Sequence, residues 1–247
     1  MRLAIISDIH GNCFALDAVL ADMGHYSIDQ IVCLGDAIQS GPQPAETVER
    51  LRALACPVVM GNSDAWLLSG QETNPQEKLM PVTYQVREWS LQQLTPEDQT
   101  FIAGFQPTVE IALENGKRLL CFHGSPRSFH EVILPTTPEA EFQEILGSAE
   151  GILFTGGHTH LQYLRRLGDS FFFNPGSVGY AYNRQRSGDD FQLDPWAEYA
   201  ILSLAEGQLG VEFRRIAFDV NEWVHIIRAS QRPNAEAFAG CYHAREV

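Results

Sequence analysis

The stretch LAIISDIHGN, residues 3–12, decides how the chain folds. Its apolar half, residues 3–6, is typical of a buried strand, and its polar half carries side chains with chemical potential. Asn12 is a suitable N-cap for a helix, because apolar residues follow it at helical spacing. The chain therefore opens with a strand, a polar loop and a helix.

The same alternation continues through the first sixty residues. Apolar runs over 31–34 and 58–60 predict two further buried strands, and Pro44 begins a second helix between them. A β-α-β-α-β order predicts parallel strands joined by right-handed crossovers. The fold class is therefore α/β.

The remaining sequence predicts a helical insertion followed by a mainly β region. Residues 65–104 have helical patterns, and Thr95 with Pro96 begins a second helix there. Later strands are predicted over 108–113, 118–122, 151–155, 161–167 and 170–173, with two more between 199 and 218. A hairpin turn is expected at Glu114-Asn115-Gly116-Lys117 and a helix over 138–146.

The C-terminal part predicts one more helix from Val220 to Ile227, and a poorly patterned tail after Pro233. No repeat, low-complexity tract or linker divides the chain. We therefore expect a single domain over residues 1–247, with the helical insertion near 65–104 and a C-terminal helix and tail near 219–247.

The charge balance restricts the class of partner. Acidic residues number 31 and basic residues 17, so the formal charge is −14. Such a chain repels a phosphate backbone at long range, and we expect no stable binding to nucleic acid. A small phosphorylated substrate remains compatible with this charge if metal cations lie in the site.

Compartment and assembly are constrained more weakly. No run approaches the roughly 20 apolar residues that span a bilayer. The N-terminal apolar run is too short for a secretory signal and Asp8 interrupts it. The five cysteines form no C-x-x-C pair, which favours reduced thiols. We expect a cytoplasmic protein without membrane contact, and the sequence gives no support for an oligomer.

Side chains that bind metals follow five predicted strands. In α/β sheets ligands bind beyond the carboxyl ends of strands, so these side chains are expected at one edge. Their oxygen and nitrogen donors, without a thiolate, suit Mn²⁺, Fe or Zn²⁺ better than a structural zinc–cysteine site. The candidates are Asp8, His10, Asp36, Asn62, His123, His158 and His160.

The order of these motifs resembles that of the calcineurin-like metallophosphoesterases, whose pattern is D-x-H, G-D, G-N-H-[DE], a late H and G-H-x-H. The corresponding stretches are Asp8-Ile9-His10, Gly35-Asp36, Gly61-Asn62-Ser63-Asp64, His123-Gly124 and Gly157-His158-Thr159-His160. The turn NPGSVG, residues 174–179, is similar to the small prokaryotic phosphodiesterase branch of that family. The resemblance implies a four-layer α/β/β/α sandwich of two mixed β-sheets flanked by helices.

The resemblance also implies a dinuclear site. It assigns the first ion to Asp8, His10 and His160, the second to Asn62, His123 and His158, and makes Asp36 the bridge. The ions would be Mn²⁺, with Fe, Zn²⁺, Ni²⁺ and Mg²⁺ as alternatives, about 3.5–4 Å apart around a hydroxide that attacks phosphorus.

Roles beyond metal binding follow from the same resemblance. Catalytic roles are implied for Asp36, Asn62, Asp64 and His123, and substrate contacts for Asn12 and Asn62. Independently of the resemblance, Arg127, shortly after His123, is a candidate for a substrate contact. Arg184 and Arg186, in a polar stretch over 180–195, are further candidates for a phosphate contact. For all three arginines the alternative interpretation is a solvated surface charge.

The chain departs from the family pattern at Ser63, where many members have a histidine that protonates the leaving group. Serine is a poor general acid, and general-acid catalysis contributes about 10²–10⁴ in rate. We therefore expect substrates with good leaving groups, or proton donation by Asp64, His130 or a metal-bound water. Asp64 could instead cap the helix that follows it.

Four functions remain open at this stage. The first is a metal-dependent phosphoesterase acting on phosphodiesters or small phosphorylated compounds. The second is a non-catalytic scaffold on the same fold, as in the retromer scaffold subunit, although all seven ligand positions are retained here. A phosphoprotein phosphatase is the third. An amidohydrolase is the fourth, but that class opens with H-x-H on its first strand. His25, His225 and His243 are interpreted as structural.

Overall fold

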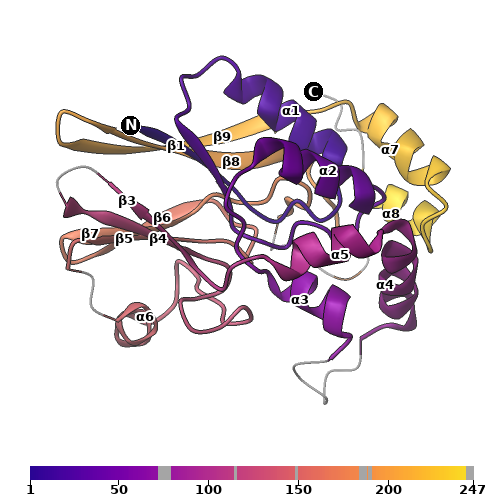
Figure 1. Cartoon of the computed structure of the whole chain (residues 1–247), viewed down its shortest axis with the longest axis horizontal. Helices are drawn as coiled ribbons and strands as arrows, with labels where there is room; N and C mark the ends of the chain where they lie inside the picture. The colour runs from indigo at the N-terminus through magenta and orange to yellow at the C-terminus, as the bar shows by residue number, and fades with distance from the viewer. Residues whose placement is uncertain (72–78, 114–115, 148–149, 184–187, 189–190, 243–247) are drawn as a thin grey trace.

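Two mixed β-sheets lie face to face in the computed structural model of the chain, which describes residues 1–71, 79–113, 116–147, 150–183, 188 and 191–242 (Figure 1). The four-stranded sheet has the order β2 (Gln30–Cys33), β1 (Arg2–Ile6), β8 (Trp196–Ala205) and β9 (Gln208–Ala217). The five-stranded sheet has the order β3 (Val109–Ala112), β4 (Arg118–Phe122), β5 (Ile152–Gly156), β7 (Ser170–Asn174) and β6 (Tyr163–Leu167). The pairs β1–β2, β4–β5 and β5–β7 are parallel, and the others are antiparallel.

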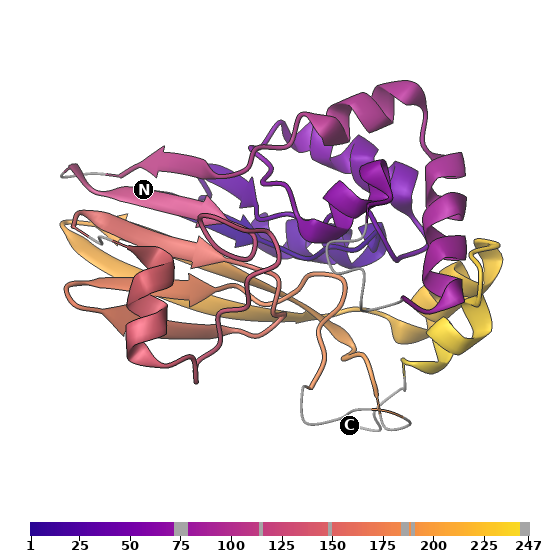
Figure 2. The ribbon, with the colours of Figure 1, turned by 90° about the horizontal axis from the view of Figure 1, so that it is seen from below.

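Helices cover the outer face of each sheet. Helices α1 (Cys13–Met23) and α2 (Pro44–Leu54) pack on the four-stranded sheet, and α6 (Glu139–Leu146) packs on the five-stranded sheet (Figures 1 and 2). The predicted α/β/β/α sandwich is confirmed. Beyond one end of the strands lie α3 (Asn62–Ser69), α4 (Pro81–Gln93), α5 (Pro96–Ala103), α7 (Val220–Ala229) and α8 (Ala235–Gly240). Among the described helices, none has the length and apolar character needed to cross a bilayer.

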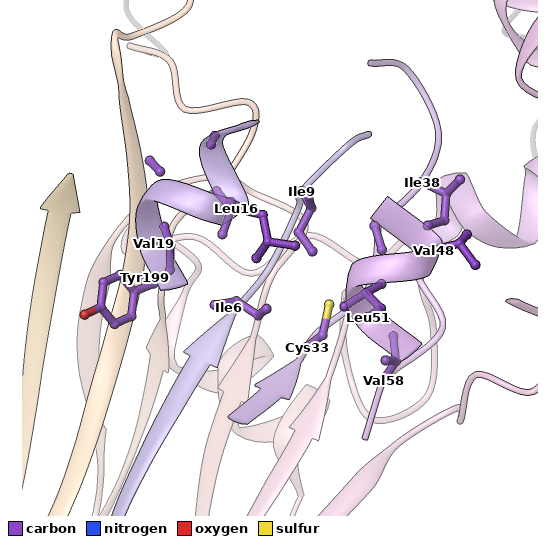
Figure 3. Packing of buried hydrophobic residues seen from close by; sticks show 14 of the residues in the cluster. Ile6, Ile9, Leu16, Val19, Cys33, Ile38, Val48, Leu51, Val58 and Tyr199 are labelled. Carbon is purple, nitrogen blue, oxygen red and sulfur yellow. The ribbon is translucent and has the colours of Figure 1, made fainter. Parts of the chain in front are cut away.

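Strand β1 is buried on both faces, which explains its unbroken apolar run. Successive side chains of a strand point to opposite faces. Leu3 and Ile5 lie in the core between the two sheets, whereas Ala4 and Ile6 belong to the core under the helices. Figure 3 shows Ile6 beside residues of α1 and α2. This double burial fixes the register of β1, and therefore the position of the loop that follows it.

Local signals in the sequence account for several helix starts. Asn12 caps α1, with its Oδ1 accepting from the Ala15 N–H at 2.9 Å. Thr95 begins α5 and forms a capping box with Asp98. The predicted hairpin corresponds to the antiparallel pair β3–β4, although Glu114 and Asn115 of its turn lie outside the described residues.

One expectation about secondary structure was wrong, and one helix was not anticipated. The strand predicted over 58–60 is reduced to isolated parallel bridges from Val58 to Cys33 and from Val59 to Gln106. Pro57 has no N–H to extend the ladder, and helix α3 begins directly after Gly61. The tail after Pro233, for which no pattern was found, contains α8.

Candidate metal centre

The carboxyl ends of β1, β2, β4 and β5 meet at one edge, where the structure brings together the seven residues proposed as ligands. Two groups of possible ligand atoms lie there, each with its atoms within 4.8 Å of one another. The first group is Asp8, His10 and His160, and the second is Asp36, His123 and His158. Asn62, the first residue of α3, joins the second group because its Oδ1 lies 2.9 Å from His123 Nε2.

The first group has the character of a cation site. Asp8 Oδ1 lies 3.2 Å from His160 Nε2 and 3.8 Å from His10 Nε2. The carboxylate is fully buried, and Oδ1 has no hydrogen bond of acceptable geometry to any described residue. Its other oxygen accepts from Ser7 Oγ and from the His158 N–H. An orphaned buried carboxylate oxygen is costly, and a bound cation would satisfy it.

Backbone carbonyls fix the orientation of three of the four histidines. His10 Nδ1 donates to the Gln39 carbonyl at 3.0 Å, His123 Nδ1 to that of Leu34 at 2.8 Å, and His160 Nδ1 to that of Tyr180 at 2.7 Å. Because a carbonyl only accepts, the proton of each neutral ring lies on Nδ1. The Nε2 lone pairs therefore face the site, as in metal-binding histidines with an outer hydrogen bond.

Asp36, a member of the second group, also faces the first group. Its Oδ2 is 3.5 Å from His123 Nε2 and 3.8 Å from His10 Nε2, so a single oxygen faces both. Ser63 holds this carboxylate from the other side, with its N–H donating to Oδ1 and its hydroxyl donating to Oδ2, both at 2.7 Å. This placement is the one that a bridging ligand requires.

The pKa values of the buried site residues show which of them carry a charge when no metal is bound. Burial raises the pKa of Asp36, but His123, His10 and Ser63 together outweigh burial and the pKa is lowered. Burial lowers the pKa of His123, but Asp36, Asp8 and the Leu34 carbonyl together outweigh burial and the pKa rises to about 9. Burial lowers the pKa of His158 to about 4, so its ring is neutral. A metal that binds to the second group would therefore displace a proton from His123.

The backbone around the site is unusual. Asp8, His10, Asp36, His158 and His160 have φ between 48° and 65°, in the left-handed region. Such φ values are uncommon outside glycine, and where they cluster they often mark functional sites. No feature of the sequence predicted this conformation.

The NPGSVG turn supports the loops that carry the ligands, although the sequence showed only its likeness to a family. Ser177 Oγ donates to the Asp8 carbonyl at 2.8 Å, and the Gly179 N–H donates to the same carbonyl at 3.1 Å. Asn174 Nδ2 donates to the Gly157 carbonyl at 2.6 Å. Ser7, Ser63, Asn174 and Ser177 thus position the candidate ligands, a role that the sequence assigned to none of them.

Asn12 and Arg127, both expected at the substrate, have other partners here. Asn12 is buried, caps α1 through Oδ1, and donates from Nδ2 to the Gly179 carbonyl at 3.3 Å. The exposed Arg127 forms ion pairs with Glu131 at 2.7 Å and Glu144 at 3.7 Å.

The candidate proton donors also differ in their surroundings. The buried Asp64 accepts from the N–H groups of Ala37 and Ile38, so it anchors the loop that follows Asp36 and caps α3. Burial and the nearby Asp36 raise the pKa of Asp64 to about 7. His130 is exposed, and desolvation lowers its pKa. Arg184, Arg186 and His243 lie outside the described residues.

The order of these ligands along the chain identifies the family. A model of the calcineurin-like phosphoesterase superfamily domain matches residues 1–193, which contain all seven ligand candidates. The chain belongs to the calcineurin-like phosphoesterase superfamily. The resemblance stated from the motifs is thereby confirmed, and membership supports a phosphoesterase activity of the hydrolase class.

Individual proteins of known sequence or structure resemble the chain over most of its length. Phosphodiesterase YfcE of Escherichia coli K12 is 28% identical over 188 residues, which cover 72% of this chain and 79% of that protein. Protein MJ0912 of Methanocaldococcus jannaschii is 27% identical, covering 89% of each chain. A metallophosphoesterase structure from Sphaerobacter thermophilus has a TM-score of 0.72 at 26% identity, covering 98% of both chains. The fold also matches the structure of PH1004 from Pyrococcus horikoshii, with a TM-score of 0.81 at 18% identity over 100% of this chain and 99% of that one.

Proposed function

We propose that the protein is a dinuclear metal-dependent phosphoesterase that hydrolyses phosphodiesters or other small phosphorylated compounds. The observation that carries the proposal is the position of Asp36 Oδ2, which faces the first group through His10 and the second through His123. The similarity to phosphodiesterase YfcE supports the choice of diesters.

The donor set combines imidazole nitrogens with carboxylate and amide oxygens and therefore suits several divalent ions, of which we propose Mn²⁺, with Fe, Zn²⁺, Ni²⁺ and Mg²⁺ as alternatives. Asp8, His10 and His160 would hold one ion, and Asn62, His123 and His158 the other. When bound, such a pair activates water at neutral pH and stabilises the charge of the phosphoryl oxygens. Its charge exceeds that of Asp8 and Asp36, so a strongly acidic chain can still bind an anionic substrate here.

The protein's own residues set the geometry. The carbonyls of Leu34, Gln39 and Tyr180 keep the Nδ1 proton away from the site, and Ser63 holds Asp36 between the groups. Because the Ser63 hydroxyl donates to Asp36, its proton is engaged and is a poor source for a leaving group. We therefore propose a preference for substrates with acidic leaving groups.

The compartment is proposed as well. All five cysteines are free thiols, which supports a cytoplasmic location because disulfides form mainly in oxidising compartments. The partner that we propose is a small phosphorylated compound rather than a nucleic acid, in keeping with the net charge of −14.

The test is hydrolysis of bis-p-nitrophenyl phosphate after removal of metals and addition of Mn²⁺. We expect turnover only with a divalent ion, and a fall of at least about 10³-fold in kcat for Asp36→Ala, which corresponds to about 4 kcal/mol. Asp17→Asn, at an exposed ion pair with Arg50, is the matched control and should keep its activity.

A set of further substrates separates the proposal from its alternatives. Faster hydrolysis of a phosphopeptide than of any diester would indicate a phosphoprotein phosphatase. No hydrolysis of diesters, monoesters or phosphopeptides with any of the five metals would leave a non-catalytic protein on this fold and would refute the proposal.

A further inference from the structure

The C-terminal arm, which we define as residues 219–242 with α7 and α8, lies beyond the part of the chain that the family model matches. It contacts Ser40, Gly179 and Tyr180, in the two loops whose Gln39 and Tyr180 carbonyls accept the Nδ1 protons of His10 and His160. We propose that this arm positions His10 and His160, through Arg232 and Phe238, and thereby sets the affinity of the first metal ion separately from that of the second. The inference rests on the proposed dinuclear site.

Arg232 is half-buried, and its hydrogen-bond partners are backbone oxygens. Its Nε donates to the Ser40 carbonyl at 2.6 Å, and Nη1 donates to the Pro233 carbonyl at 2.8 Å. The guanidinium lies 4.2 Å from the centre of the Phe238 ring. No carboxylate of the described residues forms an ion pair with it, and burial lowers its pKa. Desolvating an arginine in this way is costly, so the carbonyl that it holds is expected to matter.

The Ser40 carbonyl belongs to the loop that orients His10. Gln39, the preceding residue, accepts the Nδ1 proton of His10 through its own carbonyl at 3.0 Å. Ser40 has φ of +105°, a conformation that is strained for any residue but glycine and persists only when neighbours hold it. The hydrogen bond from Arg232 is therefore well placed to hold this loop. The loop in turn keeps the Nε2 lone pair of His10 pointing toward Asp8 and His160, the other members of the first group.

Phe238 contacts Tyr180, whose carbonyl orients His160, the other histidine of the first group. Its ring stacks on Tyr180 with ring centres 6.1 Å apart. The Tyr180 carbonyl accepts the Nδ1 proton of His160 at 2.7 Å. The Tyr180 ring packs edge-on against the His10 ring, with ring centres 5.3 Å apart. Tyr242 adds a bond from its hydroxyl to the Gly179 carbonyl at 3.1 Å. The arm thus contacts a residue next to Gln39 and the ring of Tyr180, the two residues whose carbonyls orient the first-group histidines.

The second group has different support. His123 Nδ1 donates to the Leu34 carbonyl at the end of β2, and Ser63 of α3 holds Asp36. These contacts are made by the sheet and by α3, not by residues of the arm. Loosening the arm should therefore weaken one ion and spare the other. Loss of an outer-shell partner of this kind lowers metal affinity by about 10–100-fold.

The experiment measures binding of Mn²⁺ alone, by equilibrium dialysis and electron paramagnetic resonance, in two single-site backgrounds of the full-length chain. His158→Ala is intended to leave the first group, and His160→Ala the second. We expect Arg232→Gln to weaken binding about 10–100-fold in the His158→Ala background, and by less than about threefold in the His160→Ala background. Arg232→Lys, which keeps a donor and a cation, should recover part of the loss.

Two further variants guard against a trivial result. Arg228→Gln breaks an exposed ion pair with Glu236 on the same arm and should leave both affinities unchanged. Phe238→Leu removes the stacking on Tyr180 but keeps an apolar side chain, and it should repeat the selective loss. Thermal unfolding of each metal-free variant, monitored by circular dichroism, shows whether that variant is folded.

The possible outcomes separate the two proposals. Equal losses in both backgrounds, or no loss in either for Arg232→Gln and Phe238→Leu, would overturn the positioning role. A wild-type chain that binds fewer than two Mn²⁺ ions would overturn the dinuclear site together with it. A chain that shows the selective loss but hydrolyses no phosphoester would retain the positioning role and lose the proposed function.

Discussion

Left-handed backbone at five candidate ligands is the main feature at the scale of single residues. Asp8, His10, Asp36, His158 and His160 share it, and strained backbone of this kind costs on the order of 1–3 kcal/mol for each residue. The motifs predicted which side chains meet, because metal-binding residue types recur at strand ends. They could not predict the conformation, because hydrogen bonds from distant segments, such as Ser177 and Ser63, impose it.

Gly157 lies where the loop after β5 closely approaches Ser7 and Asp8, and a substitution there would test this close packing. A Cβ at this position would lie 2.0 Å from Ser7 Oγ and 2.8 Å from Asp8 Oδ2. We expect Gly157→Ala to displace Asp8 and lower kcat/KM on bis-p-nitrophenyl phosphate by at least about 100-fold, since small shifts at a catalytic centre have effects of that size. Steady-state kinetics with saturating Mn²⁺ measures the loss.

Gly210→Ala in β9 is the matched control, because a Cβ there meets no atom within 4 Å. It should keep wild-type kinetics. An active Gly157→Ala enzyme would show that Ser7 and Asp8 can move without consequence, contrary to the tight packing described above.

The occupied hydroxyl of Ser63 predicts a strong dependence on the leaving group. With a series of substituted phenyl phosphodiesters, we expect kcat/KM to fall steeply as the pKa of the leaving phenol rises, because the contribution of about 10²–10⁴ from a general acid is missing. The slope of log kcat/KM against that pKa is the measurement. If the slope is shallow for the wild-type enzyme and steep for His130→Gln, proton donation would instead be assigned to the exposed His130 ring.

At the scale of helices and strands, predictability depended on how local the determining interaction is. Helix α1 was predictable because its cap, Asn12, and its apolar face are adjacent in sequence. The segment 58–60 has the composition of a strand, but whether it extends depends on Pro57 and on partners as distant as Gln106. Helix α8 was missed because its buried residues, Phe238 and Ala239, are too few to show a period. The role of Asp64 stayed open because its N–H donors lie in another loop.

Asp22, in the last turn of α1, joins this helix to two strands. Its carboxylate accepts from Tyr199 of β8 at 2.6 Å and from Arg214 of β9 at 2.8 Å. Burial raises the pKa of Asp22, but the hydrogen bonds from Arg214 and Tyr199 outweigh it and the pKa is lowered. We expect Asp22→Asn to lower the free energy of unfolding at pH 7 by about 1–2 kcal/mol.

The pH dependence follows from the sign of that shift. A lowered pKa in the folded state stabilises it fully above the unfolded value near 3.8, and the contribution is lost as the pH falls through the folded value. The gap between wild type and Asp22→Asn in urea titrations should therefore close below about pH 4. A gap that stays constant from pH 7 to pH 3 would contradict the assignment to the charged carboxylate.

At the scale of the whole molecule, the sheet that carries Asp8 and Asp36 is completed from outside the matched family region. Residues 1–193 include β1 and β2, but β8 and β9 lie beyond them. Without β8, strand β1 would have an open edge, and the core between the sheets would lose Ala200, Leu202 and Leu204. The sequence predicted two strands in this region, but their pairing with the first strand depends on contacts some 200 residues apart.

A chain that ends at residue 193 should therefore fail to fold, despite containing every ligand candidate. We expect aggregation, or a species without a cooperative thermal transition and without near-ultraviolet circular dichroism. A chain that ends at residue 218 keeps both sheets and should melt cooperatively, while losing affinity for the first ion only. Cooperative melting of the shorter chain would show that β8 is dispensable.

The pairing of β1 with β8 also has a consequence for biosynthesis. The first strand leaves the ribosome long before the eighth is translated, by roughly 10–40 s at usual elongation rates. During that interval β1, an apolar strand, lacks its neighbour β8. We expect chaperones to bind the exposed β1 strand. The candidate metal site can therefore form only after β8 has been translated, and we expect metal loading to follow the synthesis of that strand.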